Sequence, residues 1–226
     1  MILAIDTSLG SAVAVVDAAG VVHGAASSPD ALGHAEIIGT LIESALAEAS
    51  ATPRDITHVA AGMGPGPFTG LRIGVAAARA FALARAVPVV AVASHDAAAL
   101  AEFEATDAGA GNDGGSSHPS APFAIVTDAR RREYAYTVYA DLTSEGLPLR
   151  ASEPGLVPRA DLDARLAQFD PPPARIDVTS ISAGVLGRLA ARMLAAGMVG
   201  AGSTAEPLYL RSPDITLGHA PKRVSA

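Results

Sequence analysis

Short apolar runs and polar turns alternate along the first half of this chain. Apolar runs bounded by turn residues occur at 2–5, 11–16, 21–26, 58–61 and 87–93. Runs of this length between turn signals are typical of β-strands, so five strands are predicted. The first three are separated by Asp6-Thr7-Ser8 and by a turn that ends at Gly20, which predicts a three-strand meander.

From His34 onward the apolar positions change to a helical spacing. One stripe holds Ile37, Ile38, Leu41, Ile42, Ala45 and Leu46. This spacing predicts an amphipathic helix that ends before Pro53. Shorter helices are predicted at 96–104, at 161–169 and within 178–195.

A second long helix is predicted at 71–86, with Thr69 as its N-cap and Val87-Pro88 as its stop. This helix is apolar nearly all round, and most of its residues are small. Two interpretations are open. Either it is a core helix between a sheet and another helix, or its small-residue face contacts a second protein chain.

A loop rich in glycine and proline, residues 62–70, leads into that helix. A glycine loop at a helix N-terminus is typical of phosphate sites, because free N–H groups and the helix dipole attract an anion. Here Pro65 and Pro67 lack a backbone donor, and no lysine follows the loop. We therefore favour a rigid structural or interface loop over a phosphate loop.

The second half begins like the first. A strand at 123–127 ends at Asp128, and strands are predicted at 133–140 and 147–152, around a turn that contains Gly146. The order strand, aspartate, strand, glycine turn and strand therefore occurs twice, which indicates an internal duplication. Meanders followed by alternating helices and strands predict an α/β chain with mixed sheets. Duplicated in this way, the pattern suggests the actin-like and sugar-kinase-like (ASKHA) fold, with any ligand between two lobes.

The predicted lobes are joined by a segment without periodicity. Residues 106–122 are rich in Gly, Ser, Ala and Asp, which predicts a flexible linker or loop. We therefore assign 1–105 to an N-terminal lobe and 123–226 to a shortened C-terminal lobe. That second lobe is expected to end in an extended segment at 206–211 and a frayed tail.

Composition and charge exclude several function classes. The 226 residues carry a net charge of −7 and a single lysine, which disfavours a dominant grip on nucleic acid. There is no cysteine, and the N-terminus has no signal-like segment, so we expect a cytoplasmic protein. The helix at 71–86 is too short and too interrupted by arginine to span a membrane.

The residue types allow little catalytic chemistry. None of the six histidines has a second histidine close enough to share a helix face, so no metal site is predicted. Asp6 and Asp128, with Thr7 and Ser8, are the candidates for a vestigial nucleotide cleft. The alternative is that both aspartates cap turns, which we favour. No residue is assigned a catalytic role.

Five segments carry a family resemblance. They are 2–8, His34-Ala35-Glu36, the block 64–74 (GPGPFTGLRIG), Asp128-Ala129-Arg130 with Glu133-Tyr134, and 207–211 (PLYLR). Together they resemble the TsaB family, also called YeaZ. The match extends from the first residue to about Arg211, and the block 64–74 is its most specific part.

The resemblance implies an actin-like fold and a non-catalytic role. TsaB proteins are the dimerisation subunits that support a TsaD-type threonylcarbamoyltransferase, which modifies adenosine 37 of tRNA. It further implies a TsaE-type ATPase as a partner, a homodimer when alone, and tRNA contact only through the complex. It implies no cofactor of the subunit's own, although ATP or ADP would fit at an interface of the complex.

The partner interface is expected on the two long helices. Its predicted residues are His34, Ile37, Ile38, Leu41, Ile42, Phe68, Thr69, Leu71, Arg72, Val75, Ala76 and Arg79. The sequence departs from the family at Pro67 and Ala35, where serine is usual. It also has Pro171-Pro172-Pro173 where a strand and a glycine turn are expected, so the second lobe is predicted to be shortened.

Two other functions are alternatives to this one. A small ATPase or sugar-kinase-like phosphotransferase would use Asp6 and Asp128 as its cleft carboxylates. A metallopeptidase rests only on fold analogy, and the absence of paired histidines makes it the weakest alternative.

Overall fold

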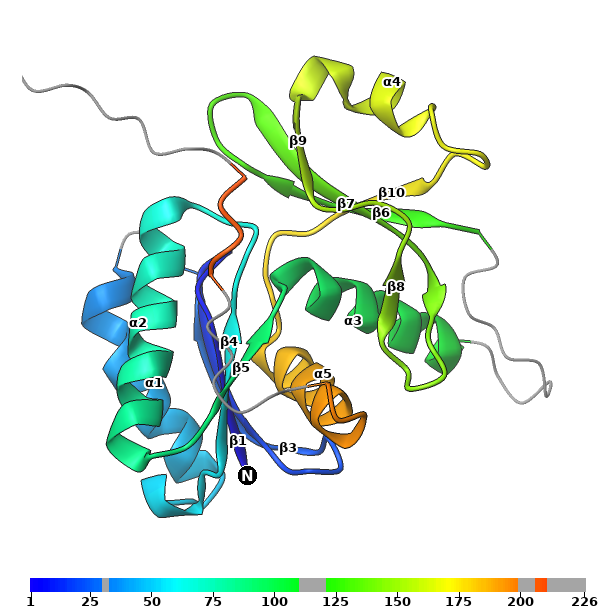
Figure 1. The fold of residues 1–226 in the computed structure, drawn as a ribbon. Coiled ribbons are helices and arrows are strands. Elements are labelled where there is room, and N and C mark those ends of the chain that lie inside the picture. The colour runs from blue at the N-terminus through cyan, green and yellow to red at the C-terminus, as the bar shows by residue number, and fades with distance from the viewer. Residues whose placement is uncertain (30–32, 110–120, 199–205, 211–226) are drawn as a thin grey trace, which may run out of the picture.

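Two sheets separated by a helical layer make up the molecule (Figure 1). The computed structural model describes residues 1–29, 33–109, 121–198 and 206–210. In these ranges the layers follow one another as two helices, the first sheet, two helices, the second sheet and one short helix.

The first sheet contains all five strands that were predicted for the first half. They are β1 (Ile2–Asp6), β2 (Ser11–Val16), β3 (Val22–Ser28), β4 (His58–Gly62) and β5 (Val89–Val92), in the order β3-β2-β1-β4-β5. The first three form the predicted antiparallel meander, and β4 and β5 run parallel to β1. The central strand β1 is buried along its whole length, as expected for a strand covered on both faces.

The second sheet repeats the core of the first. It contains β6 (Phe123–Asp128), β7 (Glu133–Leu142), β8 (Pro148–Arg150), β9 (Gly155–Pro158) and β10 (Ala174–Asp177). As in the first sheet, the leading strand pairs antiparallel with the next strand and parallel with a later one. This confirms the predicted duplication. The sequence reading missed β9 and β10, the second of which follows the run of three prolines.

Helices α1 (His34–Glu48) and α2 (Phe68–Arg85) lie on one face of the first sheet, and α5 (Ala183–Ala195) lies on the other. Helix α3 (Ser94–Gly109) lies between α5 and the second sheet. The short α4 (Leu162–Leu166) packs on the outer face of the second sheet. Short 3₁₀ turns occur at Pro53–Asp55 and Arg159–Asp161.

The lobe boundaries remain a prediction, and two observations bear on them. Residues 106–109, assigned to the linker, are the end of α3, and 110–120 lie outside the described residues. Helix α5 follows the second sheet in sequence but packs against the first, with Gly187 close to Val16 and Ala4. The two sheets therefore share one core around α3 and α5.

The segment 206–211 was predicted to be a strand or an extended segment, and the strand is not formed. The described part of it, residues 206–210, belongs to neither sheet. This segment is held by a bond from the Leu208 N–H to the Met63 carbonyl and by its side chains. Residues 211–226, predicted to be frayed, lie outside the described ranges. None of the described helices is long and apolar enough to cross a membrane.

Two glycines let α2 lie close to the end of β1. A Cβ at Gly74 would stand 2.1 Å from Thr7 Oγ1, and one at Gly70 would stand 2.7 Å from the Thr7 carbonyl oxygen. Thr7 Oγ1 donates to the Gly70 carbonyl at 2.7 Å. The glycines of the motif thus serve close packing, and Thr7 lies beneath the helix.

We expect Gly74→Ala to lower the free energy of unfolding by about 1–3 kcal/mol, because its methyl group overpacks Thr7. The matched control is Gly39→Ala on α1, where no atom lies within 4 Å of the added Cβ. Relief of the glycine entropy cost should stabilise that variant by up to about 1 kcal/mol. Urea unfolding of both variants measures the difference, and equal effects at the two sites would contradict the packing account.

Candidate functional site

The outer surface of α1 and α2 is one candidate site. The two helices lie side by side on the same face of the first sheet (Figure 1). Their outward positions are mostly small residues, and one large apolar side chain, Leu83, is 83% exposed. The exposed small residues are Ala35, Gly39, Ala47, Ala76, Ala80 and Ala84. A smooth surface of this kind allows the close approach of another chain.

The predicted interface residues differ in their exposure. His34, Ile38, Leu71 and Val75 are buried within the chain's own core, because the apolar stripes of both helices face the first sheet. Ile37, Leu41, Ile42 and Phe68 are only half-buried. The predicted residues that are exposed are Thr69, Arg72, Ala76 and Arg79. A partner would therefore contact the opposite side of each helix from the one the apolar stripe indicates.

The start of α2 also differs from the prediction. The helix begins at Phe68 with Pro67 as the N-cap residue, and Thr69 lies inside its first turn. No side chain caps the helix, since proline stands where the family usually has serine. Pro67 instead contributes its ring to the wall of a pocket between the sheets.

His34 is a structural residue in this geometry. It is buried, and its Nδ1 lies 2.6 Å from Ser11 Oγ, so the hydroxyl satisfies the ring. No group of three or more histidine, aspartate or glutamate side chains within the described ranges is arranged to hold a metal ion.

Asp6 lies at the centre of a buried hydrogen-bond cluster. Its carboxylate accepts from the Ser8 N–H at 2.8 Å, from Ser8 Oγ at 2.6 Å and from Ser94 Oγ at 2.5 Å. Burial raises the pKa of this carboxyl group above its usual value, although the serine hydrogen bonds oppose the shift. Both carboxylate oxygens therefore accept hydrogen bonds from the chain itself. This arrangement agrees with the turn-capping alternative of the sequence analysis.

Asp128 occupies a different environment, at the turn between β6 and β7. It is exposed and accepts from the Arg130 N–H at 2.8 Å and from the Arg159 guanidinium at 2.7 Å. The hydrogen bond from Arg159 holds the pKa of the carboxyl group below its usual value. Asp128 lines the pocket between the sheets, whereas Asp6 does not. The two predicted cleft carboxylates are therefore not brought together on one pocket wall.

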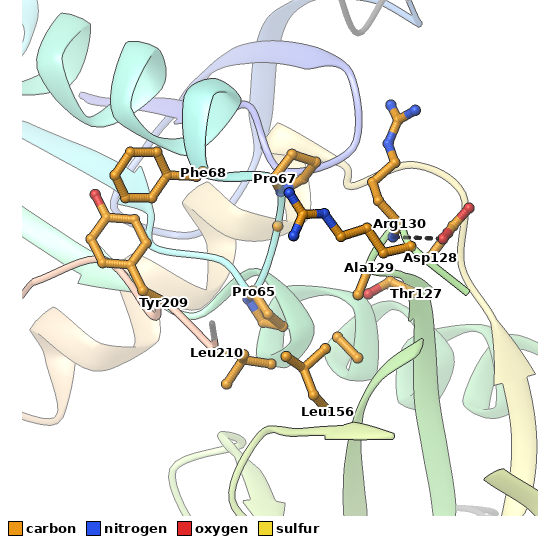
Figure 2. A pocket seen from close by; sticks show the side chains of 13 residues that line it. Pro65, Pro67, Phe68, Thr127, Asp128, Ala129, Arg130, Leu156, Tyr209 and Leu210 are labelled. Atoms are coloured by element: carbon orange, nitrogen blue, oxygen red, sulfur yellow. Dashed lines mark hydrogen bonds between the residues drawn. The ribbon is translucent and has the colours of Figure 1, made fainter. Parts of the chain in front are cut away.

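That pocket has a volume of about 460 Å³ (Figure 2). One wall is the loop from Pro65 to Phe68, and the facing wall is the β6–β7 turn with Asp128 and Arg130. Arg130 is one of three consecutive arginines with positive φ, at 65°, 51° and 64°. Such backbone angles are uncommon for residues other than glycine and are found where surrounding contacts fix a turn.

The first residues of α3 hold both walls of the pocket in place. Ser94 bonds to Gly64 through both its amide and its hydroxyl group, at 2.7 and 3.1 Å. His95 bonds to Thr137 at 2.8 Å and to Thr127 at 3.0 Å. Burial lowers the pKa of His95 to about 3, so its ring is neutral at physiological pH. A neutral ring offers one donor and one acceptor, which matches the two hydroxyl groups.

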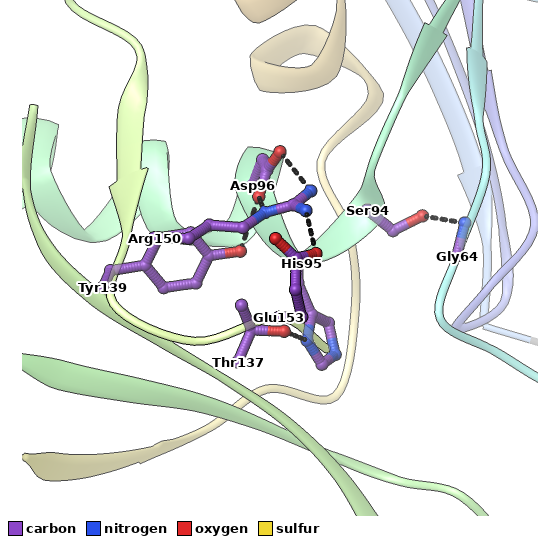
Figure 3. A network of polar contacts seen from close by, with 8 residues as sticks. All are labelled: Gly64, Ser94, His95, Asp96, Thr137, Tyr139, Arg150 and Glu153. Carbon is purple, nitrogen blue, oxygen red and sulfur yellow. Dashed lines mark hydrogen bonds and ion pairs between the residues drawn. The ribbon is translucent and has the colours of Figure 1, made fainter. Parts of the chain in front are cut away.

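A second network of polar side chains lies beside His95 (Figure 3). Arg150 binds both oxygens of Asp96, at 2.7 and 2.8 Å, and the Tyr139 hydroxyl donates to the same carboxylate at 2.7 Å. Burial raises the pKa of Tyr139 well above its usual value. The N-terminal turn of α3 is therefore bonded to three strands of the second sheet, β6, β7 and β8.

The segment 206–210 forms a further wall of the pocket. Its Tyr209 ring packs 4.8 Å from the ring of Phe68, and the Tyr209 hydroxyl accepts from Arg72 Nε at 3.3 Å. Tyr209 and Leu210 both line the pocket (Figure 2). The sequence predicted an ordered strand or extended segment here, but not its place beside the pocket. Their docking on α2, 137 residues away in sequence, has no signal in local patterns.

Sequence reasoning also missed Ser94 and His95 as determinants of the site. Their position just after the predicted strand at 87–93 could have indicated them. The carboxyl ends of parallel strands are where α/β folds place their functional side chains.

Comparison with known proteins gives a family match over more than half of the chain. The family model described as TsaD, tRNA N6-adenosine threonylcarbamoyltransferase, matches residues 20–146. A tRNA N6-adenosine threonylcarbamoyltransferase of Streptococcus pneumoniae is 49% identical over 59 residues, which are 26% of this chain and 18% of that protein. An uncharacterised protein of Mycobacterium tuberculosis (strain H37Rv) is 34% identical over 225 residues, which cover 94% of this chain and 92% of the relative.

Two solved structures from Pseudomonas aeruginosa share the whole architecture. YeaZ is 25% identical with a TM-score of 0.69, and the match covers 92% of this chain and 99% of that one. A protein described as similar to peptidase YeaZ has a TM-score of 0.72 at 24% identity, covering 93% of this chain and 99% of that one. The second likeness supports the fold alone.

Proposed function

This chain belongs to the TsaB (YeaZ) family, and from that premise we propose that it is the non-catalytic partner subunit of a TsaD-type threonylcarbamoyltransferase. Its actin-like α/β fold and its membership of a tRNA-modification family are established by the matches above. The proposal is that its own task is to bind and support the enzyme that modifies adenosine 37 of tRNA.

One observation carries the proposal: the outer face of α1 and α2 is open and presents small side chains and Leu83, interspersed with Glu36, Glu43, Glu48, Arg72 and Arg79. Leu83 is 83% exposed among small residues, and surfaces of this kind are typical of association sites. In contrast, Asp6 is buried and both of its carboxylate oxygens accept hydrogen bonds from Ser8 and Ser94, which favours a structural role for this carboxylate. These two features favour a binding role over a chemical one.

The remaining partners are proposals of the same kind. We propose that the chain pairs with itself through the α1–α2 face when no TsaD-type subunit is present. We further propose that a TsaE-type ATPase joins the complex, that tRNA is reached through the complex, and that the assembly works in the cytoplasm. The residues present do not point to a cofactor of the chain's own, and ATP or ADP is assigned to an interface of the complex.

The direct test is a titration of the host's TsaD-type subunit with this chain in a calorimeter. We expect saturable binding with one copy of each chain, and light scattering should show the isolated chain as a dimer. A monomer that gives no heat with the TsaD-type subunit would refute the proposal.

The alternative function, a small ATPase or sugar-kinase-like phosphotransferase, is favoured by one feature. The pocket of about 460 Å³ between the sheets has Asp128 and Arg130 on its wall. Against this, Asp128 is already paired with Arg159, and Pro65 and Pro67 offer no backbone donors to phosphate.

We therefore expect ATP with magnesium to bind the isolated chain no more tightly than about 1 mM, which gives little calorimetric heat. We also expect no phosphate release above background. The control is Asp128→Asn, which should behave as wild type in both assays and lose no more than about 1 kcal/mol of stability, since its ion pair is exposed. Turnover that depends on Asp128 would favour the enzyme instead.

A further inference from the structure

Arg72, on the first turn of α2, is held by aromatic side chains on two sides. Its guanidinium carbon lies 3.8 Å from the centroid of the Phe68 ring and 5.9 Å from that of Tyr209. Its Nε donates to the Tyr209 hydroxyl at 3.3 Å. Tyr209 is in turn fixed by ring contact with Phe68 and by the adjacent bond from the Leu208 N–H to the Met63 carbonyl. The arginine is thus oriented by the start of α2 and by the C-terminal segment 206–210.

Among the described residues, none bonds to the two terminal nitrogens of Arg72. Within residues 1–29, 33–109, 121–198 and 206–210, no carboxylate forms an ion pair with this side chain, and Nε makes its one hydrogen bond. Arg72 is also exposed. Arg150 and Arg159, in contrast, each donate a terminal nitrogen to a carboxylate. An oriented guanidinium with both terminal groups open is arranged to receive a planar oxyanion in a bidentate manner.

The surroundings of Arg72 favour a protein carboxylate over a nucleic-acid phosphate. Arg72 lies one helical turn from Ala76 and next to Thr69, so it is continuous with the outer face of α2. That face, with exposed Leu83, suits a protein surface. The net charge of −7 opposes a phosphate backbone. Arginine and tyrosine are also the side chains most enriched among residues that dominate binding energy at protein interfaces.

We propose that Arg72, clamped by Phe68 and Tyr209, is the anchor that receives an aspartate or glutamate of the TsaD-type partner. This inference rests on the proposed function and adds two points to it. It assigns the chemistry of one contact, a bidentate arginine–carboxylate pair. It also makes the C-terminal segment 206–210 part of the association site, with Tyr209 as a positioning residue that acts through Arg72.

The test is calorimetric titration of the host's TsaD-type subunit with wild type, Arg72→Ala, Arg72→Lys and Tyr209→Phe. We expect Arg72→Ala to weaken binding by at least about 30-fold, since truncation of one partner leaves a charge unpaired in the interface. Arg72→Lys keeps the charge but loses the fork and the stacking, so about a 10-fold loss is expected. Tyr209→Phe removes the hydroxyl acceptor alone, and about a 3-fold loss is expected.

The matched control is Arg54→Ala, which removes an exposed arginine of the same lobe from the 3₁₀ turn after α1. It should leave the partner affinity within about 2-fold of wild type, as is usual for a residue outside the contact. The salt dependence of binding is a second readout. Added NaCl should lower the partner affinity of wild type more steeply than that of Arg72→Ala, because salt screens the arginine–carboxylate pair.

The outcomes separate this inference from the proposed function. No binding by the wild-type chain would refute the proposed function itself. Wild-type binding that Arg72→Ala leaves unchanged would overturn the anchor alone. If Arg72→Ala lowers tRNA binding in a gel-shift assay but not binding to the TsaD-type subunit, the receiving group is a phosphate and the inference is wrong.

Discussion

Ala76→Glu is expected to weaken association with the TsaD-type subunit by about 100-fold or more. Ala76 is exposed on the outer face of α2, in the middle of the smooth surface formed with α1. A glutamate there would add bulk and a charge to the contact surface. One helical turn from Arg72, it would also compete with the partner for that guanidinium, and the combined cost is several kcal/mol. Because the side chain is exposed on a single copy of the chain, the fold of each copy should remain intact, which far-ultraviolet circular dichroism checks.

The control for that variant is Ala105→Glu. Ala105 is also an exposed alanine in a helix, but it lies on α3, away from the α1–α2 face. Calorimetry with the TsaD-type subunit and light scattering of the isolated chain measure both associations. If Ala76→Glu binds as tightly as Ala105→Glu, the partner does not use this face.

The second large effect is expected at His95. His95→Ala should lower the free energy of unfolding by about 3–5 kcal/mol, because it leaves a cavity and two buried hydroxyl groups without their partner. Those hydroxyls belong to Thr127 and Thr137, so the first turn of α3 would lose its bonds from His95 to β6 and β7 and keep the bond from Asp96 to Tyr139. Urea unfolding measures the loss. A cost below about 1 kcal/mol would contradict the structural role of the bonds.

The pH dependence of the same residue provides an independent check. The unfolded chain binds a proton at this histidine below about pH 6.5, whereas burial keeps the folded-state pKa of His95 at about 3. Between these two pKa values the unfolded state binds more protons than the folded state. The free energy of unfolding therefore decreases as the pH falls, by up to about 1.4 kcal/mol per pH unit. His95→Gln should lack this part of the slope. Subtracting the stability–pH curve of His95→Gln from that of wild type isolates the contribution of His95. The contribution of Asp6, whose raised pKa acts in the opposite direction, is common to both curves.

Much of the fold was predictable because apolar spacing is a local signal. The strands of the first sheet, both long helices and the duplication are all encoded in short-range patterns. The errors have identifiable causes. β10 is short and mostly exposed, so it has little apolar signal. Thr69 has the chemistry of a helix cap, but the fixed φ of Pro67 starts the helix one turn earlier than expected.

The site was less predictable, because its geometry depends on long-range contacts. A stripe such as Ile38 and Leu41 shows which side of a helix is apolar, but it does not show whether a sheet or a partner covers that side. Here the sheet covers it, so the surface that we propose for a partner is the small-residue side. The clamp on Arg72 depends on Tyr209, far away in sequence, and the buried cluster at Asp6 depends on Ser94.

The most direct test of the central claim is reconstituted tRNA modification, with threonylcarbamoyladenosine quantified by mass spectrometry. The reaction contains the host's TsaD-type and TsaE-type proteins, tRNA, ATP and the activated threonylcarbamoyl donor. We predict that modification requires this chain, survives Asp6→Asn or Asp128→Asn in any variant that remains folded, and is lost with Ala76→Glu. Full modification without the chain, or loss of modification by Asp128→Asn with association intact, would contradict a supporting, non-catalytic role.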